Sequence, residues 1–220
     1  MRRLLIGLSF SLAACASAPP PETPAYHHPF TNAAEWSKTF DDPSRDAWQK
    51  PQSVVDAMEI ATGATIADIG AGTGYFEPYL SRAAGPGGKV LALDVEPDMV
   101  AHLRDRAAKN QLANVEAKQV AADDPGLAPG SVDRILVVDT WHHIANRVDY
   151  AARLAVALKH GGEVFIVDFT REAQHGPPPE HRVPREEVAR ALETAGLVVR
   201  DVDAGLPDQY VVAGKRPQSQ

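Results

Sequence analysis

The sequence predicts an α/β fold built on a mostly parallel sheet with a reversed hairpin at its C-terminal edge. Short apolar runs alternate with amphipathic helical patterns over most of the 220 residues, which is typical of parallel strands joined by helical crossovers. Several runs are apolar almost throughout, as in strands that are buried on both faces. The last two runs are separated only by Leu206–Asp208, and so short a connection implies an antiparallel pair.

Each expected element rests on its own pattern. The segment 147–160 is expected to be a helix because Tyr150, Leu154 and Leu158 fall on one face. Gly161 is expected to end it, since glycine commonly follows a helix. The expected strands are 65–70, 89–94, 114–119, 134–139, 163–168, 197–205 and 209–216, and the other expected helices are 75–84, 97–111 and 185–196.

Composition limits the classes of protein that fit. Hydrophobic residues make up 44% of the chain, charged residues 23%, and the formal net charge is −7. A chain of this size and composition forms one domain with a sizeable core. It carries no long basic run, so we expect no nucleic-acid partner, because such binding needs a cationic surface.

The N-terminus has the pattern of an export signal. Arg2 and Arg3 precede a short apolar run, Leu4–Ala14, which is typical of a secretory signal peptide. Leu12–Cys15 resembles the lipobox of bacterial lipoproteins, and Cys15 is the only cysteine. We therefore expect a protein that is exported, faces the periplasm and is lipid-anchored at Cys15, most simply to the outer membrane; the alternative is plain cleavage and a soluble periplasmic protein.

These patterns divide the chain into four parts. The signal peptide occupies residues 1–15, and a proline-rich tether occupies residues 16–32. The domain extends over residues 33–216, and residues 217–220 form a tail.

A glycine loop follows the first strand of the domain. Ile66–Ile69 runs directly into Gly70, Ala71, Gly72, Thr73 and Gly74. Glycines permit a tight turn and let a ligand approach the backbone, and the N–H groups at the following helix start face that ligand.

The spacing of the loop separates it from two better-known glycine motifs. A dinucleotide fingerprint would need glycine where Tyr75 stands, and a phosphate loop would need a lysine after the glycines. Asp94 ends the next strand about twenty residues further on. A carboxylate there can accept hydrogen bonds from both hydroxyls of a ribose, whether in NAD or in S-adenosylmethionine.

The motif Asp68–Gly74, read with Asp94, resembles the first motif of the class I S-adenosylmethionine-dependent methyltransferases. The resemblance covers about Pro51–Arg216. It implies a Rossmann-like seven-stranded sheet with a reversed C-terminal edge strand and S-adenosylmethionine as cofactor. It also implies residue roles: Asp68 and the glycine loop bind the cofactor, Asp94 holds the ribose, Val95 packs on the adenine and Asp123 accepts from the adenine amino group, with Ala122 as the alternative position.

Three polar residues end the fourth strand, where the transferred methyl group would lie. Asp139, His142 and His143 are the candidate catalytic residues, and the small-molecule branch of the family often carries such a pair. One histidine can accept a proton near neutral pH. In the alternative interpretation both are structural and bond the backbone of the strand end. The alternative is favoured because positioning alone can supply most of the catalysis of methyl transfer.

Two further segments are expected to cover the cleft. Residues 40–51 precede the core and contain Trp48; residues 171–184 connect the fifth strand to a helix and contain His175, His181 and Arg182. The second is long for such a connection, and long loops at strand ends tend to bind ligands. We expect Trp48, His181 and Arg182 to contact substrate; the alternative is a merely stiff, proline-rich crossover.

The leading hypothesis is a methyltransferase that acts on a small molecule. The alternative is a non-catalytic periplasmic module that captures S-adenosylmethionine or another nucleoside. Tyr75 argues against an NAD-linked oxidoreductase. The histidines are scattered, without metal-ligand spacing, so we expect no metal.

Overall fold

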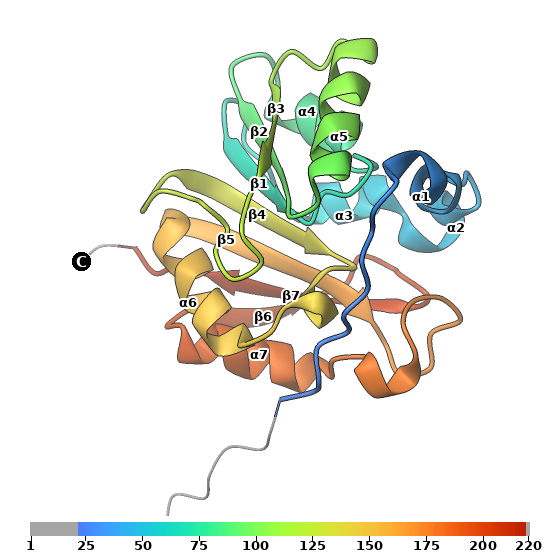
Figure 1. Cartoon of the computed structure of the whole chain (residues 1–220). Helices are drawn as coiled ribbons and strands as arrows, with labels where there is room; N and C mark the ends of the chain where they lie inside the picture. Colours follow the sequence, from blue (N-terminus) through green and yellow to red (C-terminus); the bar gives the residue numbers. More distant parts are fainter. Residues whose placement is uncertain (1–21, 219–220) are drawn as a thin grey trace, which may run out of the picture.

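A computed structural model describes residues 22–218, which form a seven-stranded sheet with helices on both faces (Figure 1). The strand order is β3-β2-β1-β4-β5-β7-β6. Only β7 runs antiparallel to both of its neighbours. The strands are β1 (Thr65–Ile69), β2 (Lys89–Asp94), β3 (Val115–Gln119), β4 (Val132–Val138), β5 (Leu158–Phe169), β6 (Val198–Val202) and β7 (Gln209–Lys215).

The predicted α/β class, the seven strands and the C-terminal reversal are confirmed. The reversed strand β7 is inserted between β5 and β6, so it lies one place inside the edge. The edge strand β6 is antiparallel to β7 and therefore runs in the direction of the other strands.

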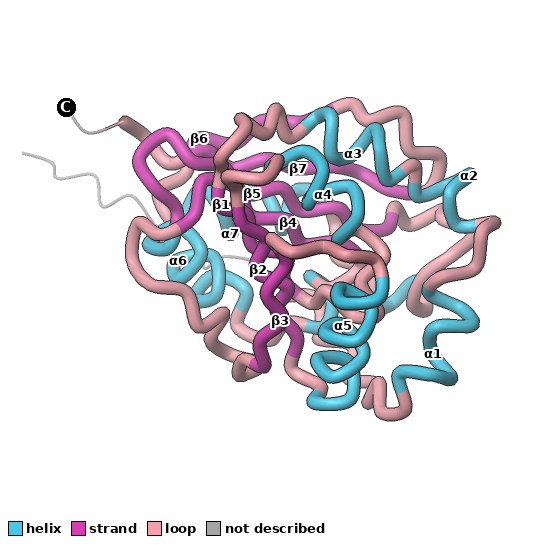
Figure 2. Tube along the Cα trace, turned by 90° about the horizontal axis from the view of Figure 1, so that it is seen from above, coloured by secondary structure: helices cyan, strands magenta, loops and turns pink. Residues whose placement is uncertain are grey.

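Helices cover the sheet in two layers. Helices α3, α4 and α5 pack on one face, and α6 and α7 pack on the other (Figure 2). Helices α1 and α2 belong to neither layer and lie beside α3 and α5 (Figure 1). The helices are α1 (Ala33–Phe40), α2 (Arg45–Gln49), α3 (Pro51–Ala57), α4 (Glu77–Ala84), α5 (Pro97–Lys109), α6 (Arg147–Ala157) and α7 (Arg185–Thr194), with short 3-10 turns η1 (Trp141–His143) and η2 (Pro179–His181).

The central strands serve both faces because their side chains alternate. In β4, Ile135 and Val137 join the core under α6, while Leu136 and Val138 join the core under α3 and α4. Full burial of such a side chain contributes about 1.5–3 kcal/mol. A strand that is apolar on both faces can pack only between two helical layers, which is why the apolar runs predicted the sheet correctly.

One predicted boundary is wrong. The helix expected over 147–160 ends at Ala157, and β5 begins at Leu158. Leu158 pairs with Val132 of β4, so the gain from sheet pairing overrides the helical periodicity. Gly161, with φ 79°, lies inside the strand rather than after a helix.

The chain order creates a crevice at the carboxyl ends of the strands. Strand β1 lies between β2 and β4. The chain therefore adds β2 and β3 on one side of β1 and the later strands on the other side. Ligands bind at such a switch point in the strand order. Residues 22–32, which had been assigned to the tether, run as an extended segment from beside α7 to α1 (Figure 1). The signal segment and Cys15 lie outside the described residues. Within residues 22–218, no helix has the length and apolar character that a membrane span requires.

Candidate active site

A cavity of about 920 Å³ lies at this switch point. Its floor comes from the carboxyl ends of β1, β2 and β4. Its cover comes from residues 26–30, from α1 and α2, and from the loop after β5. The volume falls in the range of small-molecule and cofactor sites.

The glycine loop forms one wall, and its conformation requires glycine. Gly70, Gly72 and Gly74 have φ values of 71°, 57° and 87°. A Cβ atom on Gly70 would lie 2.3 Å from Oγ1 of Thr140, and one on Gly74 would lie 2.9 Å from Leu103 of α5. Residues 70–73 line the cavity, whereas Gly74 instead allows α5 to approach the loop.

Asp94 stands beside this loop at the end of β2. Its Oδ2 accepts the N–H of Gly72 at 2.8 Å, and its Oδ1 accepts the N–H of Glu96 at 2.9 Å. Burial raises the pKa of Asp94, and the two backbone N–H groups oppose that rise. The carboxylate is therefore fixed at the cavity wall, 7% of the residue remaining exposed.

Apolar residues flank Asp94 and form a slot. Val95, Met99, Val120 and Ala122 line the cavity there. Asp123, which was expected to reach the adenine, does not line it. A tight turn, closed by the bridge between Ala121 and Asp124, follows β3 and leaves Asp123 exposed to solvent.

Asp68 lies deeper, next to a second carboxyl group. Burial and the neighbouring Glu77 carboxyl raise the pKa of Asp68 well above its usual range. Burial raises the pKa of Glu77 to about 7. Among the described residues neither carboxylate oxygen of Glu77 has a hydrogen-bond partner. The pair lies behind the glycine loop; Asp68 lines the cavity and Glu77 does not.

Asp139 belongs to a closed polar ring. Nη2 of Arg45 donates to its Oδ2 at 3.0 Å, and Nε2 of Gln209 donates to its Oδ1. Gln49 donates to Gln209 at 2.6 Å and accepts from Arg45. Burial raises the pKa of Asp139 to about 6, against the opposing effect of Arg45. Its φ of 53° is a strained backbone conformation for a non-glycine residue, of the kind that clusters at functional sites.

The two histidines have different partners. Nδ1 of His142 lies 2.8 Å from Oδ1 of Asp168, and the backbone N–H of His142 donates to Oδ2 of Asp168 at 3.0 Å. His142 and Asp168 are buried. His143 instead bonds the backbone carbonyl of Tyr26 through Nδ1. Burial and the neighbouring His142 lower the pKa of His143 to about 4, so His143 is neutral at physiological pH.

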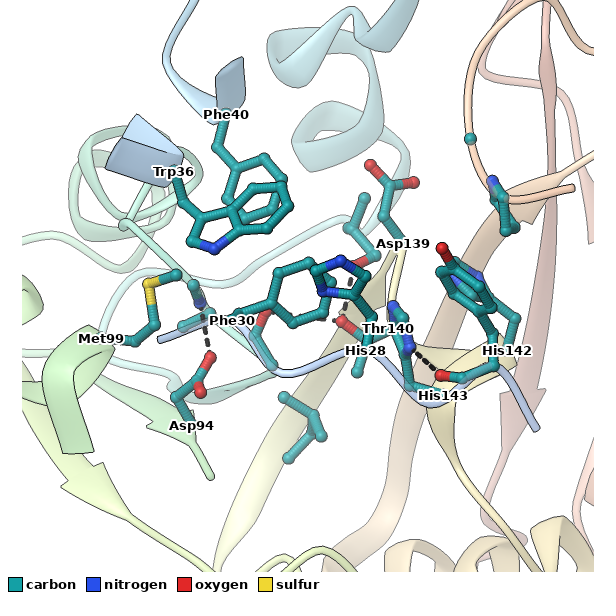
Figure 3. A pocket seen from close by; sticks show the side chains of 18 of the residues that line it. His28, Phe30, Trp36, Phe40, Asp94, Met99, Asp139, Thr140, His142 and His143 are labelled. Carbon is teal, nitrogen blue, oxygen red and sulfur yellow. Dashed lines mark hydrogen bonds between the residues drawn. The ribbon is translucent and has the colours of Figure 1, made fainter. Parts of the chain in front are cut away.

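Aromatic rings form the wall opposite the glycine loop, and we call them the ring belt. Successive ring centroids lie 4.2–6.1 Å apart from one end to the other. Figure 3 shows Phe30 between Asp94 on one side and His142 on the other. The members of the ring belt are Phe40, Trp36, Phe30, Tyr26, His143, His142, Phe169, Trp48 and His175.

The three residues that were expected to contact substrate have different surroundings in the structure. Trp48 lines the cavity and stacks on His175. His181 does not line it; its ring lies against Tyr26. Arg182 is buried under its own loop, where it donates to the carbonyls of Thr170, Arg171, Ala173, His175 and Pro177. Arg182 thus holds the loop in shape, contrary to the expected contact with substrate.

Sequence reasoning missed three contributions to the site. Asp168 is the second-last residue of β5, and Asp139 directly follows β4. The expectation that polar residues at the carboxyl ends of strands line the site therefore applied to Asp168 as well. Arg45 gave no local signal. The rings of Tyr26 and Phe30 were assigned to the tether, and that of Trp36, at the start of the domain, was given no role, although aromatic residues are concentrated there in a chain that is only 6% aromatic.

Within residues 22–218, no three His, Cys, Asp or Glu side chains gather closely enough to hold a metal ion. The groups available for binding and catalysis in the cavity are a fixed carboxylate, a glycine loop, an ion pair and a buried histidine.

A glycine loop at the switch point, with a carboxylate at the end of the next strand, defines an α/β protein that binds a nucleoside-containing cofactor. Comparisons with known proteins narrow this class. A family model described as "Methyltransferase domain" matches residues 66–162. A solved S-adenosylmethionine-dependent methyltransferase from Aquifex aeolicus is 32% identical, with a TM-score of 0.77, over 84% of this chain and 98% of that one. The chain therefore belongs to the S-adenosylmethionine-dependent methyltransferase family, and S-adenosylmethionine is its cofactor.

Curated relatives share only part of their length with it. The aklanonic acid methyltransferase of Streptomyces sp. (strain C5) is 30% identical over 129 residues, which is 58% of this chain and 59% of that protein. A ubiquinone/menaquinone biosynthesis C-methyltransferase of Hahella chejuensis is 24% identical over 53% of this chain and 47% of the relative. The chain thus spans about half the length of these relatives.

Proposed function

We propose that the protein transfers the methyl group of S-adenosylmethionine to a small-molecule acceptor and is lipid-anchored in the cell envelope. The single observation that carries the proposal is one continuous cavity that contains both the cofactor wall and a separate wall of aromatic rings. One end holds a nucleoside, and the other leaves room for an acceptor.

The residues of the cofactor wall fit S-adenosylmethionine. Asp94 would hold the ribose hydroxyls, and the apolar residues Val95 and Met99 beside it would take the adenine. The opposite charges of Arg45 and Asp139 line the cavity one strand beyond β1, where they can hold the zwitterionic amino-acid end. The bound cofactor supplies an activated methyl group on sulfonium, and the protein supplies alignment and exclusion of water.

The enclosure of the cavity favours a small acceptor over a macromolecule. Residues 26–30, α1 and the loop after β5 cover the strand ends, so a folded protein or duplex could not reach the floor. The names of the two curated relatives also point to small molecules, namely aklanonic acid and the biosynthesis of ubiquinone and menaquinone.

Calorimetric titration with S-adenosylhomocysteine tests the cofactor assignment. Asp94→Ala should weaken binding about 30-fold, roughly 2 kcal/mol, because a charge-assisted bidentate contact is lost. The matched control is Asp105→Ala on the exposed face of α5, which should bind like wild type. Absence of heat with the wild type, or equal affinity in Asp94→Ala, would contradict the proposal.

Two measurements test transfer and anchoring. Labelled cofactor and an envelope extract should yield a labelled small molecule; bound cofactor without any methylated product would favour the alternative, a module that only captures the nucleoside. The mass of the mature N-terminus should correspond to an acylated Cys15, since acyl chains bind membranes at about 0.8 kcal/mol per buried CH₂. An unmodified N-terminus would refute the anchor and leave the enzymatic proposal intact.

A further inference from the structure

The end of the cavity at His142 has flat, apolar walls. Trp48 and His175 stack with centroids 4.5 Å apart and planes inclined by 11°. Phe169 lies 6.0 Å from Trp48 and 6.1 Å from His142. Ring faces in such an arrangement favour another planar ring stacked against them.

The charges at this end are already paired. Among the described residues that line the cavity, Arg45 is the one permanent cation, and it donates to Asp139, Gln49 and the carbonyl of Phe40. Asp139 accepts from Arg45 and Gln209. These two charges are committed to each other and, in the proposed complex, to the amino-acid end of the cofactor. An acceptor with a carboxylate, a phosphate or an ammonium group would therefore find no free counter-charge here, and burying an unpaired charge is costly.

His142 is the buried histidine at this end that is built to take a proton. His175 also has a carboxylate partner, Asp208, but 46% of its side chain is exposed and its ring stacks on Trp48. Asp168 accepts from Nδ1, which fixes the tautomer and leaves Nε2 as an acceptor. Nε2 has no hydrogen-bond partner among the described residues, and the side chain lines the cavity. His143 is unsuited to the task, because its Nδ1 bonds Tyr26 and its pKa is lowered to about 4.

We propose that the acceptor is a neutral, planar aromatic compound with a hydroxyl group, whose proton His142 accepts while Asp168 positions the imidazole. The inference rests on the proposed function and specifies its acceptor. The acceptor oxygen forms a bond to the methyl carbon, and the carbon–sulfur bond breaks with its electron pair on sulfur. The hydroxyl proton passes to Nε2 of His142, and water later removes it. His142 is thereby a catalytic residue and Asp168 a positioning residue.

Binding of three matched probes tests the acceptor class. The full chain, saturated with S-adenosylhomocysteine, is titrated calorimetrically with 2-naphthol, 2-naphthoate and (2-naphthyl)trimethylammonium. We expect 2-naphthol to bind at least tenfold more tightly than either charged analogue. Equal binding of a charged analogue, or no binding of 2-naphthol, overturns the inference and leaves the proposed function standing. If S-adenosylhomocysteine itself does not bind, the proposed function fails, and the inference fails with it.

Transfer to 2-naphthol tests the roles of His142 and Asp168. The wild type should form 2-methoxynaphthalene from methyl-labelled cofactor, and binding without transfer overturns the inference. His142→Gln should lower kcat about 100-fold, in the range of lost general-base catalysis, and abolish the acidic limb of the pH profile. Asp168→Asn should lower kcat at least tenfold with KM within threefold of wild type.

Matched readouts separate these roles from simple damage to the fold. Affinity for S-adenosylhomocysteine should stay within threefold of wild type in both variants. The control is His160→Gln, which alters an exposed histidine bonded to the carbonyl of Pro217, outside the cavity. If His142→Gln keeps kcat within threefold and an unchanged pH profile, His142 is not the base. That result stands even if Asp168→Asn fails to fold.

The charged and titratable groups that face His142 also influence how kcat depends on pH. Asp168 lies behind it on β5, His143 beside it, and Asp139 near enough for the two charges to interact. Nη2 of Arg147 bonds its backbone carbonyl. The charge of His142 lowers the pKa of Asp139, so the contribution of Asp139 should move to higher pH in His142→Gln. A limb that is lost altogether in that variant belongs to His142.

Discussion

The two walls of the cavity are built in different ways. The cofactor wall consists of strand ends and one loop, and its geometry is set by backbone: glycine φ angles and N–H groups that hold Asp94. The ring belt comes from segments far apart in the chain and is positioned by side chains. Residues 26–30 are held over η1 by long-range hydrogen bonds of Tyr26 to His142 and His143 and by ring contacts with His143. A local motif thus encodes the first wall, and tertiary contacts encode the second.

The largest expected effect tests what holds the ring belt in place. Arg147 is 1% exposed and donates to the carbonyls of Thr23, Trp141 and His142 and to Glu187. Arg147→Met should lower the free energy of unfolding by about 3 kcal/mol, because Glu187 and several carbonyls lose their buried partner. Chemical denaturation measures this loss.

The same variant should also release the segment over the cavity. Limited proteolysis should cut residues 22–30 faster in this variant. The segment can open more easily there, because the contacts that Arg147 makes with it in the wild type are missing. Arg153→Met is the control, because Arg153 lies on the same helix with half of its side chain exposed. An unchanged unfolding midpoint for Arg147→Met would mean that the segment is held by its other contacts.

The second prediction concerns the cofactor wall. Gly70→Ala places a Cβ atom 2.3 Å from Thr140 at a φ of 71°. Affinity for S-adenosylhomocysteine should fall about 100-fold, roughly 2.7 kcal/mol, because the loop must move to relieve the clash. Gly87→Ala is the control, since nothing lies within 4 Å of its added Cβ. Titration calorimetry measures both; equal affinities would show that the loop yields without cost.

The contrast explains how much the sequence could predict. The sheet, the glycine loop and Asp94 follow from local periodicity and spacing, and the structure places all of them as expected. Asp123 was misplaced because the end of β3 turns through a bridge that periodicity does not reveal. The end of α6 was misplaced because Leu158 pairs with Val132 far away in the chain.

The acceptor side of the site depends on such distant contacts almost entirely. Arg182 looked like a surface cation in a binding loop, yet five carbonyls of that loop surround it. Tyr26 and Phe30 looked like part of a tether, yet they form the centre of the ring belt. Nothing in the local sequence says which side chain a distant segment will meet.

The third prediction uses the pH dependence of stability in the cofactor wall. Burial raises the pKa of Glu77 from its ordinary value near 4.5 to about 7. Between these values the folded protein keeps a proton that the unfolded chain has lost, so the stability of the wild type falls as pH rises. Glu77→Gln avoids that loss and should be more stable than wild type by about 2 kcal/mol at pH 6.

At pH 4 the difference in stability between Glu77→Gln and wild type should nearly vanish, because both side chains are then neutral in the folded and in the unfolded chain. Denaturant unfolding at several pH values measures the trend, with the exposed Glu193→Gln as control. A gain that does not change with pH would contradict the assignment of the shifted pKa to Glu77.

The prediction with the smallest expected effect tests whether the ring belt is coupled to the cofactor wall. Asp41 follows α1, which carries Trp36 and Phe40 of the ring belt, and its Oδ1 accepts from Thr73 of the glycine loop at 2.9 Å and from Arg106 at 2.6 Å. Asp41→Asn keeps an acceptor for Thr73 but loses the ionic attraction to Arg106. Because both side chains are about one quarter exposed, we expect about 1 kcal/mol, a fivefold weaker affinity for S-adenosylhomocysteine.

Titration calorimetry resolves a change of this size. Asp42→Asn is the control, since that carboxylate accepts only from Ser44 within the described residues. A fivefold loss in Asp41→Asn alone would mean that the position of α1 contributes to holding the loop. The rings over the cavity would then be coupled to cofactor binding, and an acceptor that shifts α1 would also change the affinity for the cofactor. Identical affinities in all three proteins would mean that the cofactor wall is complete by itself and that the ring belt serves the acceptor alone.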